Sequence, residues 1–247
     1  MILGTFNILH GRSLADGAVD TGRLVDACRS LDAHVLCLQE VDRSQARSGG
    51  VDQAAAVGPG RFEPAIMGEP GAAWQAATDA DADRPAAPGY GVAIVSRLAV
   101  HAWHVLRLKA APVRSPVAVP GGRGRFVLLP DEPRVVLAAD LGDLLVATTH
   151  LSFVPGYNLV QLRRATRWLA SFGRPAVLLG DLNAPGPLPR WASGWRPLVT
   201  ARTYPADRPA FQVDHVLAHG AVPPVTRTDV RRLPLSDHRA LLVELRG

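Results

Sequence analysis

The stretch VLCLQE, residues 35–40, places four apolar residues directly before two polar ones. A second stretch, AVLLGD at residues 176–181, has the same form. Strands with one solvent-facing side alternate between apolar and polar residues, whereas strands covered on both faces are apolar throughout. Both stretches therefore predict strands buried within a layered α/β structure, each with polar residues at its carboxyl end.

Six further apolar runs of strand length accompany these two. They cover residues 2–6, 92–95, 135–139, 144–148, 213–217 and 240–245. Two other segments, residues 24–31 and 159–172, have the spacing of amphipathic helices, and Asp20 or Thr21 is available to cap the first. We therefore expect one α/β domain that spans residues 1–247.

The composition fits a single folded domain, and it leaves open whether the positive charge binds an anionic ligand. A chain of 247 residues can bury one large core, and 47% hydrophobic with 20% charged residues argues against disorder. The net charge of +5 comes almost entirely from arginine, because Lys109 is the only lysine. A count does not separate a nucleic-acid surface from a coding bias, so nucleic acid stays open as a partner.

Nothing in the sequence predicts a disulfide framework, a signal peptide or a membrane span. Cys28 and Cys37 lie in apolar stretches without metal-ligand spacing, which predicts small buried thiols. The chain opens on a strand-like run, and no apolar run reaches the roughly 20 residues that cross a bilayer. We expect a cytoplasmic protein without an obligate protein partner.

Residues 68–89 form the clearest loop, rich in Ala, Asp, Pro and Gly. Asp79, Asp81 and Asp83 alternate as in the opening of an EF-hand loop. The match then fails, because Arg84 takes the place of the turn glycine. We interpret the segment as a solvated loop and not as a calcium site.

Polar side chains stand where the predicted strands end. Asn7, Glu40 and His150 close three strands, and Asp181 with Asn183 follows another. The carboxyl ends of strands in α/β sheets meet at one edge, where ligands bind. Two more polar residues precede the final strand, which would begin at that same edge if it were antiparallel: Asp237 and His238.

These residue types suit phosphoester chemistry with a hard cation. Mg²⁺ prefers carboxylate and amide oxygens, which Asn7, Glu40 and Asp237 offer, and no thiolate or histidine cluster suggests zinc. A carboxylate such as Asp214 near His238 would orient the imidazole and stabilise its cation. The sequence contains no P-loop, no G-x-S-x-G and no dinucleotide-binding motif.

Seven short motifs together carry a resemblance to the endonuclease/exonuclease/phosphatase superfamily. In chain order they are TFNI (5–8), LQEVD (38–42), YGxAxxSR (90–97), THL (149–151), GDLNA (180–184), VDHVL (213–217) and SDHR (236–239). The match covers essentially the whole chain. The resemblance implies an α/β, four-layer α/β/β/α sandwich of two mixed, largely antiparallel sheets, with the metal at one end of the sheets.

The resemblance also implies roles for the polar strand ends. Glu40 looks like the centre of the metal site, with Asn7 and Asp237 beside it. His150 looks like the histidine that hydrogen-bonds the scissile phosphate. The remaining pairs look like the water-positioning pair, Asp181 and Asn183, and the Asp–His couple, Asp214 and His238. Whether Asp181 or His238 is the general base stays open.

Departures from the pattern qualify this assignment. Leu9 stands where apurinic endonucleases of the superfamily often carry an acid, which argues for one metal ion. Arg47 lies in a loop that resembles the small bacterial members, as does Glu132-Pro133-Arg134, in which Arg134 begins a strand. With Tyr90, these two arginines are the expected substrate contacts.

The sequence thus predicts a Mg²⁺-dependent phosphoester hydrolase, with Mn²⁺ as a second candidate ion. Each polar residue alone could be a turn former, a helix cap or a satisfied buried group, and only the ordered set favours function. The alternative is a catalytically inactive protein of the same fold that binds a phosphate ligand or acts as a scaffold. The substrate stays open among nucleic acid, nucleotide, lipid and small phosphoester.

Overall fold

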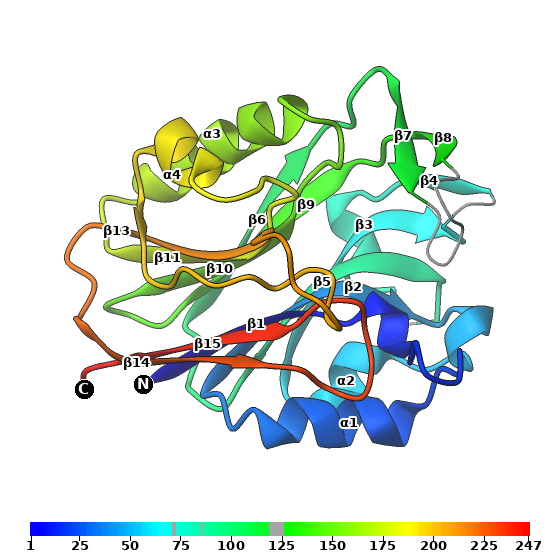
Figure 1. Cartoon of the computed structure of the whole chain (residues 1–247), viewed down its shortest axis with the longest axis horizontal. Coiled ribbons are helices and arrows are strands. Elements are labelled where there is room, and N and C mark those ends of the chain that lie inside the picture. Colours follow the sequence, from blue (N-terminus) through cyan, green and yellow to red (C-terminus); the bar gives the residue numbers. More distant parts are fainter. Residues whose placement is uncertain (71–72, 85, 119–125) are drawn as a thin grey trace.

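Two mixed sheets face each other, and helices cover the outer side of each sheet (Figure 1). The computed structural model describes residues 1–70, 73–84, 86–118 and 126–247. The first sheet has the order β14-β15-β1-β2-β5-β3-β4, and the second has the order β12-β13-β11-β10-β9-β6. Strands β7 and β8 pair with each other in a separate hairpin.

The strands of the first sheet are β1 (Ile2–Asn7), β2 (Val35–Arg43), β3 (Gly60–Gly68), β4 (Trp74–Ala76), β5 (Gly89–Ser96), β14 (Val225–Arg231) and β15 (Ala240–Leu245). Those of the second are β6 (Ala102–Leu108), β9 (Arg134–Asp140), β10 (Leu145–His150), β11 (Ala176–Asp181), β12 (Arg196–Pro197) and β13 (Asp214–His219). The hairpin consists of β7 (Arg114–Ala118) and β8 (Phe126–Pro130).

Helices α1 (Thr21–Ser30) and α2 (Gln53–Val57) lie along the first sheet, and α3 (Tyr157–Ala170) and α4 (Leu188–Ser193) lie over the second (Figure 1). Short 3-10 turns occur at η1 (Leu9–Gly11), η2 (Ala46–Ser48) and η3 (Asp79–Asp81). The Asp20 carboxylate caps α1, because it accepts a hydrogen bond from the Arg23 backbone N at 2.7 Å.

Alternate residues of the buried strands face two different layers. In β2, Val35 and Cys37 pack between the two sheets, whereas Leu36 and Leu38 pack in the cluster under α1. In β11 the residues alternate in the same way between the inter-sheet core and the cluster under α3. This double burial explains the continuous apolar runs, and the four-layer sandwich of two mixed, largely antiparallel sheets is confirmed.

Both cysteines are buried and free, as predicted. Burial raises the pKa of each thiol to about 12, so neither is a thiolate at neutral pH. In the part of the chain that the structure describes, no helix is both long enough and apolar enough to span a membrane.

Strand pairing brings the polar strand ends to one edge of the molecule. Parallel pairing of β1 with β2 sets Asn7 opposite Gln39, and parallel pairing of β10 with β11 sets His150 opposite Asp181. Antiparallel pairing of β11 with β13 places Asp214 opposite Asp181. Because β15 runs antiparallel to β1, the residues that precede it return to the end of β1.

Several elements lie outside the predicted set. Strands β3, β4, β6, β12 and β14 were not predicted, and neither were helices α2 and α4 or the β7–β8 hairpin. The segment at residues 68–89 carries β4 and η3, and its residues 71–72 and 85 lie outside the described part. There the Asp81 carboxylate accepts from the Thr78 N and Oγ1, both at 2.7 Å, so it acts as a helix cap.

Candidate active site

A cavity of about 330 Å³ opens where β1, β2, β10, β11 and β13 present their polar ends. Eight of the eleven expected site residues line it, and two more, Asn7 and Asp214, hydrogen-bond to lining residues. The lining residues are Glu40, Tyr90, Leu129, Glu132, Arg134, His150, Phe153, Asp181, Asn183, Tyr204, Val213, Asp237 and His238.

Local backbone geometry aims the polar ends into this cavity. Glu40 lies at a bulge in the pairing of β2 with β5 and has φ +56°, which turns its side chain out of the strand's alternation. Asn183 and Ser236 also have left-handed φ values, of +47° and +70°. Such conformations cost free energy in residues with a Cβ, and they cluster at functional sites.

Gly180 allows β11 to end close beside β10. Its φ is +147°, and a Cβ there would lie 2.0 Å from the Thr149 carbonyl oxygen. Only glycine fits, and the next residue, Asp181, can therefore enter the cavity. This is the physical reason for the glycine before the aspartate in the GDLNA motif.

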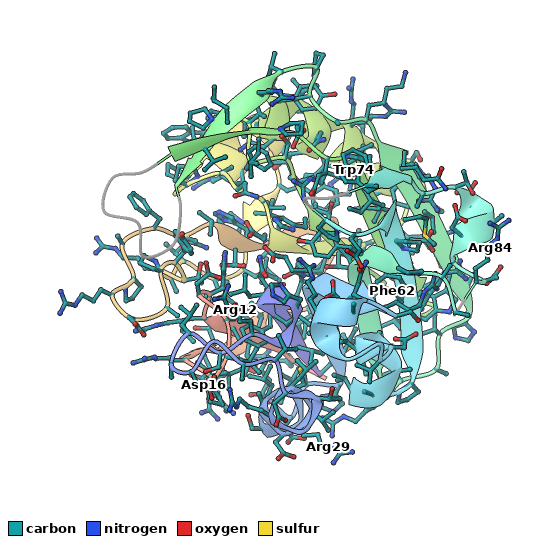
Figure 2. The ribbon with its side chains drawn as sticks, turned by 90° about the vertical axis from the view of Figure 1, so that its right-hand side faces the viewer. Arg12, Asp16, Arg29, Phe62, Trp74 and Arg84 are labelled. Carbon is teal, nitrogen blue, oxygen red and sulfur yellow. The ribbon has the colours of Figure 1, made fainter. Side chains whose placement is uncertain are left out.

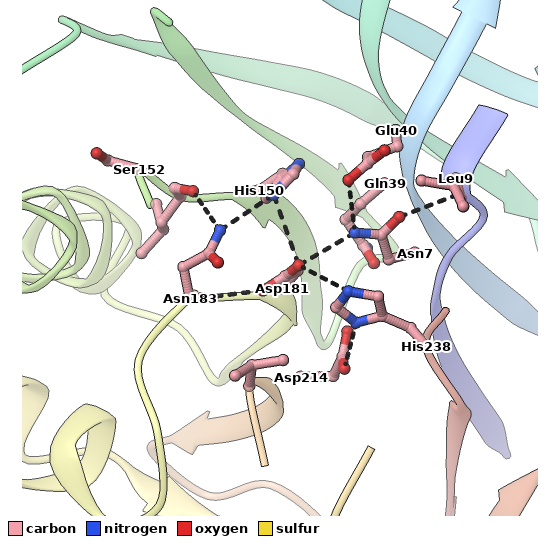
Figure 3. Close-up of polar contacts among 12 residues, drawn as sticks. Asn7, Leu9, Gln39, Glu40, His150, Ser152, Asp181, Asn183, Asp214 and His238 are labelled. Carbon is pink, nitrogen blue, oxygen red and sulfur yellow. Dashed lines mark hydrogen bonds and ion pairs between the residues drawn. The ribbon is translucent and has the colours of Figure 1, made fainter. Parts of the chain in front are cut away.

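His238 stands between two carboxylates (Figure 3). Its Nδ1 lies 2.9 Å from Asp214 Oδ2, and its Nε2 lies 3.7 Å from Asp181 Oδ2. Burial lowers the pKa of His238, but the carboxylates of Asp214 and Asp181 outweigh burial and raise it. Both carboxylates therefore favour the protonated imidazole, and the Nδ1 contact suits an N–H that donates to Asp214.

Asp181 is the centre of the polar network (Figure 3). Its Oδ1 accepts from the Asn183 N at 2.9 Å, and its Oδ2 accepts from Asn7 Nδ2 at 3.1 Å. His150 Nε2 lies 3.5 Å from the same Oδ2. Burial is the main cause that raises the pKa of Asp181, against the lowering effect of His238.

Glu40 and Asp237 form the less satisfied side of the cavity. Glu40 Oε1 accepts from Asn7 Nδ2 at 3.1 Å, and Asp237 Oδ1 is buried without a hydrogen-bond partner among the described residues. Burial raises the pKa of Glu40, and the Asp237 charge raises it further. Two neighbouring carboxylates with so few donors are suited to a cation.

Asn7 faces these carboxylates with its amide nitrogen. Its Oδ1 accepts from the Leu9 backbone N at 3.1 Å, and its Nδ2 donates to both Glu40 and Asp181. Asn7 therefore orients two acids in this arrangement. A further group with ligand atoms within 4.8 Å of one another consists of Asp181, Asp214 and His238, which already share the imidazole contacts above.

His150 is a neutral imidazole at the cavity wall. Burial lowers the pKa of His150 well below its usual value, and the charges of Arg134 and His238 lower it further. Its Nε2 lies 3.1 Å from Asn183 Nδ2, which also donates to the Leu151 carbonyl oxygen at 3.0 Å. The tautomer decides which neighbour Nε2 engages: an unprotonated Nε2 accepts from Asn183 Nδ2, and a protonated Nε2 donates toward Asp181 Oδ2.

The three expected substrate contacts divide into two groups. Tyr90 and Arg134 line the cavity. Arg47 does not, because its guanidinium donates two hydrogen bonds to the buried Asp42 carboxylate, at 2.8 and 2.7 Å, and stacks over the Tyr90 ring at 5.4 Å. Arg47 therefore lies behind the cavity wall and packs against the ring of Tyr90, which lines the cavity.

Sequence reasoning missed several residues that complete the site. Tyr204 lines the cavity, and its ring lies 4.9 Å from that of His238. Ser236 Oγ donates to the Asn7 carbonyl oxygen at 2.6 Å and accepts from the His238 N, which ties β1 to the start of β15. Ser236 was visible in the SDHR motif, whereas Tyr204 lies in a loop without any periodic signal.

Comparison with known proteins places this geometry in a family. The family model described as "Endonuclease/Exonuclease/phosphatase family" matches residues 4–238. Comparison with curated proteins gives no match.

Solved structures share the fold at low sequence identity. An endonuclease/exonuclease/phosphatase from Beutenbergia cavernae is 21% identical over 100% of this chain and 71% of that chain, with a TM-score of 0.64. A mannosyl-6-phosphatase from Bacteroides thetaiotaomicron is 15% identical over 100% of both chains, with a TM-score of 0.63. Truncated TDP2 from Caenorhabditis elegans is 17% identical over 98% of this chain and 95% of that chain, with a TM-score of 0.56.

Members of the matched family are typically phosphoester hydrolases and generally depend on a divalent metal. The family model covers nearly the whole chain, and the strand ends carry the acids, amides and histidines described above. The chain belongs to the endonuclease/exonuclease/phosphatase family.

Proposed function

We propose that this protein is a Mg²⁺-dependent phosphoester hydrolase that also accepts Mn²⁺. One observation carries the proposal: the poorly satisfied pair Glu40 and Asp237 lies beside a hydrogen-bonded chain that contains His238. The first pair is contacted only loosely by protein cations, with His238 Nε2 3.9 Å from Asp237 Oδ1, and so suits an added cation, whereas the second already holds His238 between two carboxylates. Phosphoester hydrolysis uses both features.

Glu40 and Asp237 would hold the ion, with Asn7 beside them to orient the Glu40 carboxylate. When bound, Mg²⁺ supplies positive charge against a non-bridging oxygen of the phosphate. The unpartnered Oδ1 of Asp237 and the absence of thiolates from the cavity lining fit a hard cation.

The protein's own groups can position the phosphate and the water. The imidazolium of His238 would place positive charge against the phosphoryl oxygens, and Asn183 and neutral His150 would supply polar contacts at the opposite wall. Asp181 is the better general base of the two candidates, because the two carboxylates beside His238 keep that imidazole protonated.

Arg134 and Tyr90 would contact the rest of the substrate. Arg134 is 5% exposed, and its Nε has no hydrogen-bond partner among the described residues. A buried guanidinium with a free N–H at a cavity wall is a suitable partner for a phosphate oxygen.

Turnover of a panel of phosphoesters tests the proposal. The panel should contain bis-p-nitrophenyl phosphate as a diester and p-nitrophenyl phosphate as a monoester, since the solved neighbours include a mannosyl-6-phosphatase. We expect hydrolysis with Mg²⁺ or Mn²⁺ that chelation abolishes. Metal binding by calorimetry without turnover of any ester would instead support an inactive phosphate-binding protein.

A further inference from the structure

A second cavity, of about 460 Å³, lies next to the catalytic one. Its walls come from β3, β4, the end of β6, the start of β9 and α3. Small apolar residues line most of it, and Trp74 provides a flat, half-buried aromatic surface. Trp74 lies on the face of the molecule that Figure 2 turns toward the viewer.

Two cations at this cavity have no acidic partner in the described part of the chain. Lys109 and Arg164 line the cavity and are exposed, and their charged groups have no hydrogen-bond or ion-pair partner among the described residues. Arg107 differs, because it donates to Glu63, to Asp79 and to two backbone carbonyls. The cavity therefore pairs an aromatic surface with free positive charge.

Arg134 joins the two cavities, since it lines both of them. It is 95% buried, and its Nε has no hydrogen-bond partner among the described residues. The nearest carboxylates, those of Asp131 and Glu132, lie 3.5 and 3.8 Å away, beyond the usual N–H···O distance. A buried, weakly engaged guanidinium at the junction indicates an anionic group that bridges both cavities.

We propose that the second cavity is a subsite for a planar aromatic ring that carries an anionic group. The ring stacks on Trp74, and its phosphate lies at the junction, where Arg134 contacts it and Lys109 and Arg164 provide further positive charge. This rests on the proposed function and deepens it, because it defines the substrate as a phosphoester with an aromatic arm. A nucleoside phosphate and a simple aryl phosphate share this chemistry.

Direct binding in the presence of a chelator tests the subsite without turnover. Calorimetry of the full chain would compare phenyl phosphate, adenosine 5′-monophosphate, octyl phosphate and ethyl phosphate. Stacking of a ring on an aromatic side chain is expected to make phenyl phosphate bind about tenfold tighter than ethyl phosphate. Tighter binding of adenosine 5′-monophosphate than of phenyl phosphate would identify a nucleoside as the natural arm.

Two matched pairs of variants assign this preference to residues. Trp74→Ala should abolish the preference for phenyl phosphate over ethyl phosphate. Trp191→Ala should retain that preference, because Trp191 is 71% exposed and lines neither cavity. The double variant Lys109→Ala with Arg164→Ala should weaken all anionic probes about tenfold. The double variant Arg163→Ala with Arg167→Ala removes the same net charge from helix α3, which also carries Arg164. It should leave the binding of the anionic probes unchanged.

The outcomes separate this proposal from the proposed function. Ring-selective binding that depends on Trp74, in a chain that hydrolyses no ester, would keep the subsite and reject the hydrolase. Hydrolysis with equal binding of phenyl and ethyl phosphate would keep the hydrolase and overturn the subsite. Octyl phosphate as the tightest probe would also overturn it, because the cavity would then hold an alkyl chain. If Trp74→Ala does not fold, Trp74→Leu and the cation variants decide the question.

Discussion

The two sides of the candidate active-site cavity differ in how their charges are compensated. On one side, His238 lies between Asp214 and Asp181, and opposite charges within the protein balance one another. On the other side, Glu40 and Asp237 repel each other, and Asp237 Oδ1 has no hydrogen-bond partner among the described residues, with His238 Nε2 3.9 Å away. The first side is preorganised by the fold, whereas we propose that the second is completed by a metal ion, so perturbing each should give a different signature.

The largest effect is expected on the preorganised side. His238→Ala should lower kcat by about 10³–10⁴-fold, because it removes the cation beside the reacting phosphate. Added metal should not restore the activity, since the metal side is intact. Steady-state kinetics at two Mg²⁺ concentrations measure this, with the exposed His101→Ala as the matched control. Recovery at high Mg²⁺ would contradict the distinction between the two sides.

A smaller loss is expected from Asp214→Asn, about 10²–10³-fold in kcat. The amide keeps the shape of the carboxylate but not its charge, so the pKa of His238 should fall. Titration of the His238 ring by NMR would follow this directly. An unchanged pKa in the variant would show that Asp214 is not the partner that charges the imidazole.

On the metal side, Asp237→Asn should weaken Mg²⁺ binding by about 10–100-fold while leaving kcat nearly unchanged at saturating metal. The activity should therefore return as Mg²⁺ is raised, unlike that of the His238 variant. Calorimetric titration with Mg²⁺ gives the affinity independently of turnover. Asp237→Asn with wild-type affinity would remove Asp237 from the metal site.

The smallest effect concerns stability. The pKa of Glu40 is raised in the folded state, so the folded protein binds more protons at this residue than the unfolded chain, and Glu40 destabilises the protein as pH rises. In chelator at pH 7, Glu40→Gln should raise Tm by about 2–4 °C. This advantage should shrink as the pH falls through the raised pKa of Glu40, and excess Mg²⁺ should reverse it. Thermal melts across pH 4–8 would measure both trends.

The sequence predicts the parts of the fold that are buried on both faces. The runs at β2 and β11 are recognisable because each residue contacts one of two apolar layers. By contrast, β14 reads VTRTDVR and lies at a sheet edge with side chains that are exposed or half-buried, so no hydrophobic pattern marks it. Strand β3 contains Pro64 and two glycines, which also obscures it.

For the candidate site, the sequence predicts which residues gather but not how their atoms pair. Strand ends identified the acids, because pairing register places them together. The orientation of the Asn7 amide depends on the Leu9 N–H, which only the turn after β1 brings near. Arg47 was expected at the substrate, but the buried Asp42 engages it through two hydrogen bonds.

The pairing of β1 with β15 also governs when the site can form. Strand β1 pairs with β2 along one edge and with β15 along the other, so its second edge stays unpaired until β15 is in place. Closing a loop of this length costs entropy before any contact rewards it, and folds rich in such pairings fold slowly. A ribosome-bound chain that has emerged only through β13 contains Glu40 and Asp181 but not His238. The candidate site would therefore be completed only when the segment after β14 closes onto β1.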